Sequence, residues 1–135
     1  MYYVQVVDDE PIIRNGISKM IDWEALGFQI SCLAQNGKQA IEQLEIEKVD
    51  VIITDIEMPI MDGLRFIKEV RNLESEARKL NKKAIIVLTA YDEFEYAKTA
   101  IRYGVSEYIL KPIDEVEMTK ILVDLKRELD KKRGL

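Results

Sequence analysis

Short runs of apolar, β-branched residues alternate along this chain with longer stretches of helical period, and this alternation limits its fold more than any other feature. Strand-like runs are expected at residues 2–7, 28–34, 51–53, 84–88 and 107–110. After each run, apolar residues recur three or four positions apart, which is typical of an amphipathic helix. Repeated strand and helix units indicate a parallel sheet covered by helices on both faces. The sequence therefore predicts a doubly wound α/β fold with five strands and five helices.

The expected helices carry apolar residues on one face. Pro11 stands where the first turn of a helix tolerates it, Asn36-Gly37 precedes the second helix, and the third begins near Leu64. The residues expected on the apolar faces are Ile13, Ile17, Met20 and Ile21; Ala40, Ile41 and Leu44; Ile67, Val70 and Leu73; Phe94, Ala97, Ala100 and Ile101; and Met118, Ile121, Leu122, Leu125 and Leu129. The charged stretch 74–83 predicts a solvated tail of the third helix.

Two of the expected strands differ in their predicted burial. Residues 51–53 are continuously apolar and β-branched, which is typical of a central strand buried on both faces. In residues 28–34 the apolar side chains alternate with more polar ones. This alternation predicts a strand at the edge of the sheet, partly open to solvent.

Charged and hydroxyl side chains stand where the expected strands end. Asp8 and Asp9 follow the first strand in VVDDE, and Asp55 follows the third in TDIEMP. Lys111 follows the fifth strand in LKP, and Thr89 follows the fourth. Because the carboxyl ends of parallel strands meet at one edge of a sheet, these side chains are expected to share one site. Two like charges about 5 Å apart repel by roughly 3 kcal/mol at an effective dielectric near 20, so a divalent cation is expected among the acids.

Composition sets the outer limits of the prediction. A chain of 135 residues, 47% apolar and 33% charged, suits one domain with a sizeable core. We expect this domain at residues 1–130, and residues 131–135 as the start of a linker or an artificial chain end, with no effector domain in the sequence. The 25 acidic residues outnumber the 20 basic ones, which argues against nucleic-acid binding by this domain.

Cysteine and histidine usage narrow the chemistry further. Cys32 is the only cysteine, and no apolar run is long enough for a signal anchor or a membrane span. We therefore expect a cytoplasmic, reducing setting and no membrane partner. Histidine is absent, which leaves carboxylates, hydroxyls and lysine to carry any chemistry.

Four segments together carry a resemblance to a known family. The segments VVDDEP, TDIEMPIMDG, LTAYDEFEYA and YILKP, in this order and spacing, resemble the receiver domain of two-component response regulators. The resemblance covers essentially the whole chain and implies a flavodoxin-like receiver fold with strand order 2-1-3-4-5. The segments IDWEALGF and YDEFEYA further resemble receivers that are fused to AraC-type helix-turn-helix effectors.

The resemblance implies a phosphorylation-activated signalling switch with a defined acceptor. Asp55 would take a phosphoryl group from a sensor histidine kinase, because a carboxylate needs no base to attack phosphorus. The cofactor would be Mg²⁺, held by Asp8, Asp9, Asp55 and the main-chain carbonyl of Glu57. The side chain of Glu57 would then be free to tune loss of the phosphoryl group, and a solvated loop acid is the alternative interpretation.

The resemblance also assigns residues that sense the modification. Lys111 and the Thr89 hydroxyl would contact phosphoryl oxygens, and Tyr108 would turn inward as Thr89 moves. The Lys111–Pro112 peptide bond would be cis, as is usual in the family. The output would be altered binding at the surface of the fourth helix, fifth strand and fifth helix.

Partners and alternatives follow from the same resemblance. The expected partners are a sensor histidine kinase, DNA only through a carboxyl-terminal effector, and a second copy if phosphorylation drives dimerisation. The domain would not be an enzyme, with only phosphoryl transfer to itself and autodephosphorylation. One alternative is a Mg²⁺-dependent haloacid-dehalogenase-like phosphohydrolase, although Glu57 stands where that family has a second aspartate. The other is a receiver-like protein-binding module that is not phosphorylated.

Several aromatic residues near the fourth helix invite a different interpretation. Tyr91, Phe94, Tyr96 and Tyr103 resemble a platform for stacking bases. Their helical spacing and acidic neighbours instead favour packing and a protein contact surface. Cys32 is interpreted as a small apolar residue of the interior.

Overall fold

Five parallel strands form one sheet in the order β2-β1-β3-β4-β5, as the sequence and the resemblance predict. The computed structural model describes residues 1–76, 81–90 and 93–135. The strands are β1 (Tyr2–Val7), β2 (Phe28–Ala34), β3 (Val51–Thr54), β4 (Ala84–Thr89) and β5 (Glu107–Leu110). The register pairs Val7 with Thr54 and Thr54 with Val87, so β1 and β3 end level with each other while β4 continues to Thr89.

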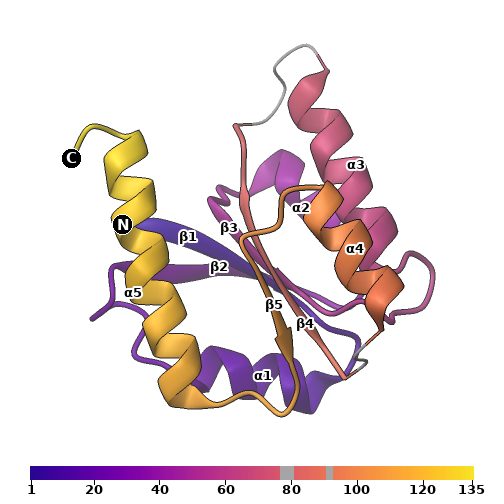
Figure 1. The fold of residues 1–135 in the computed structure, drawn as a ribbon, viewed down its shortest axis with the longest axis horizontal. Coiled ribbons are helices and arrows are strands. Elements are labelled where there is room, and N and C mark those ends of the chain that lie inside the picture. The colour runs from indigo at the N-terminus through magenta and orange to yellow at the C-terminus, as the bar shows by residue number, and fades with distance from the viewer. Residues whose placement is uncertain (77–80, 91–92) are drawn as a thin grey trace.

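Five helices cover the two faces of this sheet (Figure 1). They are α1 (Pro11–Met20), α2 (Gly37–Ile46), α3 (Gly63–Ser75), α4 (Phe94–Arg102) and α5 (Glu115–Lys132). Helices α1 and α5 pack on one face and contribute Ile17, Met118 and Leu122 to its core. Helices α2, α3 and α4 pack on the other face, where Phe66 and Ala100 are fully buried. This is the doubly wound arrangement that the alternation of strands and helices predicts.

Short polar side chains fix where three of the helices begin. The carboxylate of Asp62 accepts a hydrogen bond from the Arg65 N–H at the start of α3. Asn36 caps α2 and Asp114 caps α5 in the same way. Such caps satisfy N–H groups that have no partner inside the helix, typically at a gain of about 1 kcal/mol.

The buried fractions of the strands follow the predicted pattern. All four residues of β3 are fully buried, as its continuous β-branched run predicts. The strand at the edge, β2, is buried only at Phe28 and Ala34; Gln29 is exposed and residues 30–33 are half-buried. An edge strand lacks a neighbour on one side, so its side chains keep contact with water.

Two predictions about the helices need correction. Of the described residues in stretch 74–83, residues 75, 76, 81 and 82 are exposed as predicted, but α3 ends at Ser75 and the two ends of the stretch are covered: the Glu74 carboxylate pairs with Arg71, and Lys83 is 9% exposed. Residues 77–80 of this stretch lie outside the described residues. Phe94 and Ile101 do not face the core, because their side chains are 76% and 73% exposed. Among the described residues of α4, only Ala100 is buried.

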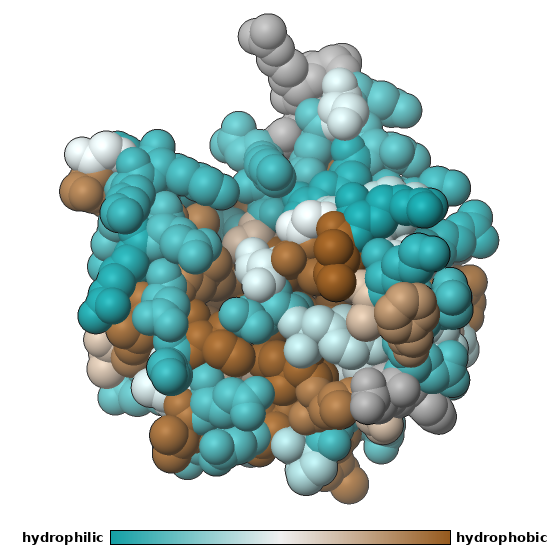
Figure 2. All heavy atoms as spheres, viewed as in Figure 1, coloured by the Kyte–Doolittle hydropathy of each residue, from teal (hydrophilic) through white to brown (hydrophobic). Residues whose placement is uncertain are grey.

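The surface over β5 carries part of this exposed apolar area. Figure 2 shows hydrophobic atoms in the middle of the face, between the hydrophilic outer sides of α5 and α4. Leu110 of β5 is 43% exposed in addition to the two apolar side chains of α4. Exposed apolar patches of this kind are typical of protein contact surfaces.

Candidate functional site

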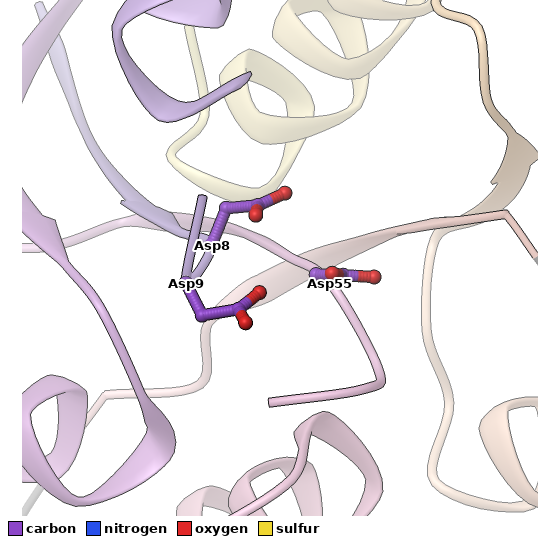
Figure 3. Close-up of side chains that lie close together, drawn as sticks. All are labelled: Asp8, Asp9 and Asp55. Carbon is purple, nitrogen blue, oxygen red and sulfur yellow. The ribbon is translucent and has the colours of Figure 1, made fainter. Parts of the chain in front are cut away.

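Three carboxylates meet at the carboxyl ends of β1 and β3. Asp8 and Asp9 follow β1, Asp55 follows β3, and ligand oxygens of the three lie within 4.8 Å of one another. Figure 3 shows these side chains gathered beside one another from two segments far apart in the sequence. Asp8 and Asp55 are 1% and 7% exposed. The structure therefore brings together the acids that the sequence places at strand ends.

Lys111 enters the same cluster from the end of β5. Its Nζ lies 2.8 Å from Oδ2 of Asp8 and 3.4 Å from Oδ2 of Asp55. The Lys111 N–H also donates to the carbonyl of Thr89 at 2.8 Å, which ties the lysine to the last residue of β4. One lysine ammonium group therefore forms ion pairs with two buried carboxylates, and the third acid, Asp9, adds a further negative charge.

The local electrostatics show that the single lysine does not balance the acids. Burial raises the pKa of the Asp55 carboxyl to about 6, and the negative charge of Asp8 adds to this against the opposing effect of Lys111. Burial alone would lower the pKa of Lys111, but the hydrogen bond to Asp8 and the two nearby negative charges raise it instead. The cluster therefore holds excess negative charge in a site of low exposure, which is costly without a further cation.

The main chain around Asp55 is held tightly. The Ile56 N–H donates to Oδ1 of Asp55 at 2.8 Å, and the Gly63 N–H donates to the Ile56 carbonyl at 2.6 Å. A Cβ atom at Gly63 would overlap the main-chain oxygen of Asp55. Only glycine allows the start of α3 to approach this closely, so the Asp62-Gly63 turn of the sequence has a direct positional role.

Thr89 and Tyr108 lie on the two strands that complete this end of the sheet. Thr89 is the fully buried last residue of β4. Tyr108 of β5 is half-buried and packs against the core on the side of α2, α3 and α4. The Lys111–Pro112 peptide bond is cis, as the resemblance predicts. The roles of Thr89 and Tyr108 as sensors stay predictions.

A cavity of about 390 Å³ opens beside the acids. Its lining includes Asp9, Glu57, Asp62 and Tyr96. The Tyr96 hydroxyl, on α4, donates to Oε1 of Glu57 at 2.8 Å. This hydrogen bond to Glu57 raises the pKa of Tyr96 to about 12, so the hydroxyl stays a donor at neutral pH.

The sequence did not reveal that Tyr96 belongs to this region. Its helical spacing predicted packing, and Tyr96 is indeed only half-exposed. No local pattern shows that the first turn of α4 approaches the loop after β3, because 39 residues separate the two partners. Of the other aromatic residues near α4, Tyr91 lies outside the described residues.

No helix in the described part of the chain is long and apolar enough to cross a membrane. Cys32 is half-buried in β2, and burial raises the pKa of its thiol.

The comparison with protein families identifies the class to which this fold and cluster belong. The family model of the response regulator receiver domain matches residues 4–123. The chain therefore belongs to the response regulator receiver domain family, the family whose motifs it resembles. The match gives no support to the haloacid-dehalogenase alternative.

Individual relatives agree with this assignment. The REC domain of AraT, a response regulator from Geobacillus stearothermophilus, is 39% identical and superposes with a TM-score of 0.87 over 98% of both chains. The regulatory domain of mrkE from Klebsiella pneumoniae is 27% identical, with a TM-score of 0.79 over 96% of this chain and 98% of that one.

Curated relatives are longer than this chain. The uncharacterized transcriptional regulatory protein YesN of Bacillus subtilis is 40% identical over 95% of this chain and 34% of its own length. The transcriptional regulatory protein HptR of Staphylococcus aureus is 33% identical over 96% of this chain and 48% of its own length. The chain thus spans between a third and a half of these relatives, and it is a regulatory domain of the response regulator family.

Proposed function

We propose that Asp55 is the phosphoacceptor of this receiver domain and that its modification is the signal. The observation that carries the proposal is the cluster itself: a nearly buried carboxylate lies beside two further acids and 3.4 Å from a lysine ammonium. This arrangement joins a nucleophile to groups that stabilise a transferred phosphoryl group.

The chemical step is an in-line displacement at phosphorus. A carboxylate oxygen of Asp55 forms the new bond to phosphorus while the bond from phosphorus to the donor's leaving group breaks. The leaving group departs with the bonding electron pair, and the product is an acyl phosphate. Hydrolysis of that acyl phosphate later restores Asp55 and releases inorganic phosphate. The domain acts on its own side chain and turns over no other substrate.

The donor set fits Mg²⁺. Asp8, Asp9 and Asp55 offer hard carboxylate oxygens within 4.8 Å of one another, and the carbonyl of Glu57 is the proposed fourth protein ligand. Hard oxygen ligands in small number, completed by water and phosphate oxygens, are what this ion prefers. When bound, it would neutralise the acids and stabilise charge on the transferring group. The excess of acids over lysine is the feature of this chain that calls for such an ion.

Three further residues have proposed roles after transfer. Lys111 is already placed between Asp8 and Asp55, so it needs only a small shift to pair with a phosphoryl oxygen. The Thr89 hydroxyl is proposed to bind another of these oxygens, and Tyr108 is proposed to respond by turning inward. The resulting change would alter the surface of α4, β5 and α5, where apolar side chains are already exposed.

The proposed partners are those of a response regulator. A sensor histidine kinase would supply the phosphoryl group, and a homodimer could form on phosphorylation. The names of YesN and HptR as transcriptional regulatory proteins support control of transcription through a separate effector, of AraC type by resemblance. The receiver would occupy residues 1–130, and residues 131–135 would lead toward that effector.

Labelling with a small phosphodonor tests the assignment. With acetyl phosphate and Mg²⁺, we expect wild type to gain one phosphoryl group by intact-protein mass spectrometry and Asp55→Asn to gain none. Asp62→Asn is the matched control, because asparagine caps a helix as well as aspartate does, and it should be labelled like wild type. Labelling of Asp55→Asn would contradict the acceptor assignment. An unlabelled wild type would instead favour a receiver-like module that is not phosphorylated.

A further inference from the structure

Helix α4 is held very differently at its two ends. At its carboxyl end, Arg71 of α3 donates from Nε to the carbonyl of Tyr103 at 2.8 Å and from a terminal nitrogen to the carbonyl of Gly104 at 3.2 Å. The same guanidinium also donates to the carbonyl of Lys83 and pairs with Glu74. This end of α4 is therefore fixed to both α3 and the start of β4 by a largely buried side chain.

The amino end of α4 has a much weaker attachment. The residue before the helix, Glu93, makes no side-chain cap, and Phe94 is 76% exposed. In the first turn, the Tyr96 ring packs at the edge of the core on this side of the sheet, and its hydroxyl donates a hydrogen bond to Glu57. Because one exposed hydrogen bond is worth little, the link between the Tyr96 hydroxyl and the loop after β3 can open at small cost.

The acceptor of that hydrogen bond stands next to the proposed phosphoacceptor. Glu57 is two residues after Asp55 and lines the same cavity as Asp9. The Cα atoms of Asp55 and Glu57 are therefore at most about 7 Å apart, and at physiological salt charges are screened only beyond a Debye length of about 8 Å. The phosphoryl group carries about 1.5 to 2 negative charges in place of the single charge of the Asp55 carboxylate. Phosphorylation therefore adds up to about one negative charge beside the Glu57 carboxylate and repels it.

We propose that the Tyr96–Glu57 hydrogen bond is a latch that holds the amino end of α4 at the site, and that phosphorylation of Asp55 opens it through repulsion of Glu57. Tyr96 is thus a positioning residue and takes no part in the chemical step. This inference rests on the proposed function of Asp55. It adds a charge-driven route from the acceptor to α4 that does not pass through Thr89 or Tyr108.

Hydrogen exchange of the α4 amides, measured by mass spectrometry with α2 as internal reference, tests the latch. In unphosphorylated protein, we expect Tyr96→Phe to exchange in α4 about two- to tenfold faster than wild type, the range that loss of one hydrogen bond gives. Tyr103→Phe removes a hydroxyl from the other end of the same helix and should leave the rate unchanged. Exchange at the wild-type rate in Tyr96→Phe would overturn the latch.

A second variant tests whether charge opens it. Glu57→Gln keeps an oxygen that accepts from Tyr96 but removes the negative charge. Phosphorylation should therefore speed α4 exchange in wild type to the rate of Tyr96→Phe, and leave Glu57→Gln slow. Equal acceleration in Glu57→Gln, or none in wild type, would overturn the proposed opening.

The same samples separate this inference from the function on which it rests. Intact mass reports how much of each sample carries a phosphoryl group. Labelled wild type with unchanged α4 exchange contradicts the latch and leaves Asp55 as the acceptor. If no sample is labelled, the proposed function fails together with the opening step, and the comparison of unphosphorylated Tyr96→Phe with wild type still decides whether the latch exists.

Discussion

Acidic side chains are paired in opposite ways at the two ends of the sheet. At the carboxyl end, Asp8, Asp9 and Asp55 share one lysine, and the pKa of Asp55 is raised to about 6 by burial. At the amino end, Asp50, Glu74 and Asp130 each accept hydrogen bonds from two different residues. Asp50, just before β3, accepts from the Tyr3 N–H at 2.8 Å and from Arg133 at 3.1 Å.

Glu74 and Asp130 are as well paired as Asp50. Glu74 accepts from Arg71 at 2.8 Å and from the Lys83 N–H at 2.6 Å. Asp130 accepts from the Tyr2 hydroxyl at 2.6 Å and from Lys126 at 2.9 Å, and these hydrogen bonds lower the pKa of Asp130. The difference teaches that the amino end contributes stability, whereas the carboxyl end keeps charge unbalanced where a ligand can use it.

The largest expected loss of stability comes from removing Arg71, whose side chain pairs with Glu74 at the amino end of the sheet. Arg71→Ala removes an ion pair and leaves the carbonyls of Tyr103 and Lys83 without their side-chain donor. We expect the free energy of unfolding in urea to fall by about 3–5 kcal/mol. The exposed Arg65 of the same helix is the control, and Arg65→Ala should change stability by less than about 0.5 kcal/mol. Equal losses in both variants would show that the amino end is no more stabilising than an ordinary surface.

At the carboxyl end of the sheet, removing a charged side chain should instead raise the free energy of unfolding. For Asp55 the folded pKa of about 6 exceeds the usual 3.8, so between these values the folded protein binds more protons than the unfolded chain. Its contribution to stability therefore falls as pH rises through this window. At about 1.36 kcal/mol per pKa unit, Asp55→Asn should be more stable than metal-free wild type by on the order of 3 kcal/mol above pH 7.

Urea denaturation with a chelator present, between pH 4 and pH 8, checks this sign. The advantage of Asp55→Asn should shrink to less than about 1 kcal/mol near pH 4, where the folded carboxyl is protonated and the unfolded one is about half protonated. Asp130→Asn at the amino end should be less stable than wild type at neutral pH. The pKa of Asp130 is lowered in the folded protein, so its ionised carboxylate stabilises the fold at any pH above the usual pKa. This stabilisation is lost as the pH falls through the pKa of the folded state. A destabilised Asp55→Asn would remove the contrast between the two ends.

Mg²⁺ bound at the acid cluster should balance its negative charge and so remove the difference between the two ends of the sheet. Because Mg²⁺ would bind the folded cluster and not the unfolded chain, a concentration one hundred times its Kd should stabilise wild type by about 2.7 kcal/mol. Asp9→Ala should abolish the resulting rise in Tm, with KCl at matched ionic strength as the control for screening. A rise that persists in Asp9→Ala would contradict the metal assignment of that residue.

The carboxyl end is also the part that the sequence predicts well. A strand of β-branched residues followed by Asp or Lys has a fixed direction, so placing Asp8, Asp55 and Lys111 at one edge needed only the parallel order of strands. The amino end has no such pattern. The pairs Tyr2 with Asp130 and Asp50 with Arg133 join residues 128 and 83 positions apart, and no local signal marks them.

Helix α4 and the stretch before β4 show why the remaining predictions failed. Apolar spacing predicted an inward Phe94 and Ile101, but α4 turns that side outward and buries only Ala100. Charge predicted a solvated Lys83, but the packing of Glu74 and Arg71 against the start of β4 covers it. In both cases tertiary contacts between distant segments override a local hydropathy pattern.

The smallest expected effect concerns the end of α5. Arg133 pairs with Asp50 at 3.1 Å, and its guanidinium carbon lies 4.4 Å from the centre of the Tyr2 ring. Because the Arg133 side chain is 45% exposed, we expect Arg133→Ala to cost only about 0.5–1 kcal/mol at low salt.

That cost should shrink at about 1 M NaCl, where the Debye length is near 3 Å. Arg127→Ala, which removes a more exposed pair at 3.7 Å from Asp124, should cost nothing measurable by urea denaturation. The result bears on the predicted boundary, because α5 continues through Lys132 while residues 131–135 are expected to begin a linker. A loss for Arg133→Ala above that for Arg127→Ala would make residue 133 part of the stabilised amino end. Equal losses for the two variants would support the domain boundary near residue 130 that the sequence predicts. Residue 133 would then contribute nothing to the stability of the amino end of the sheet.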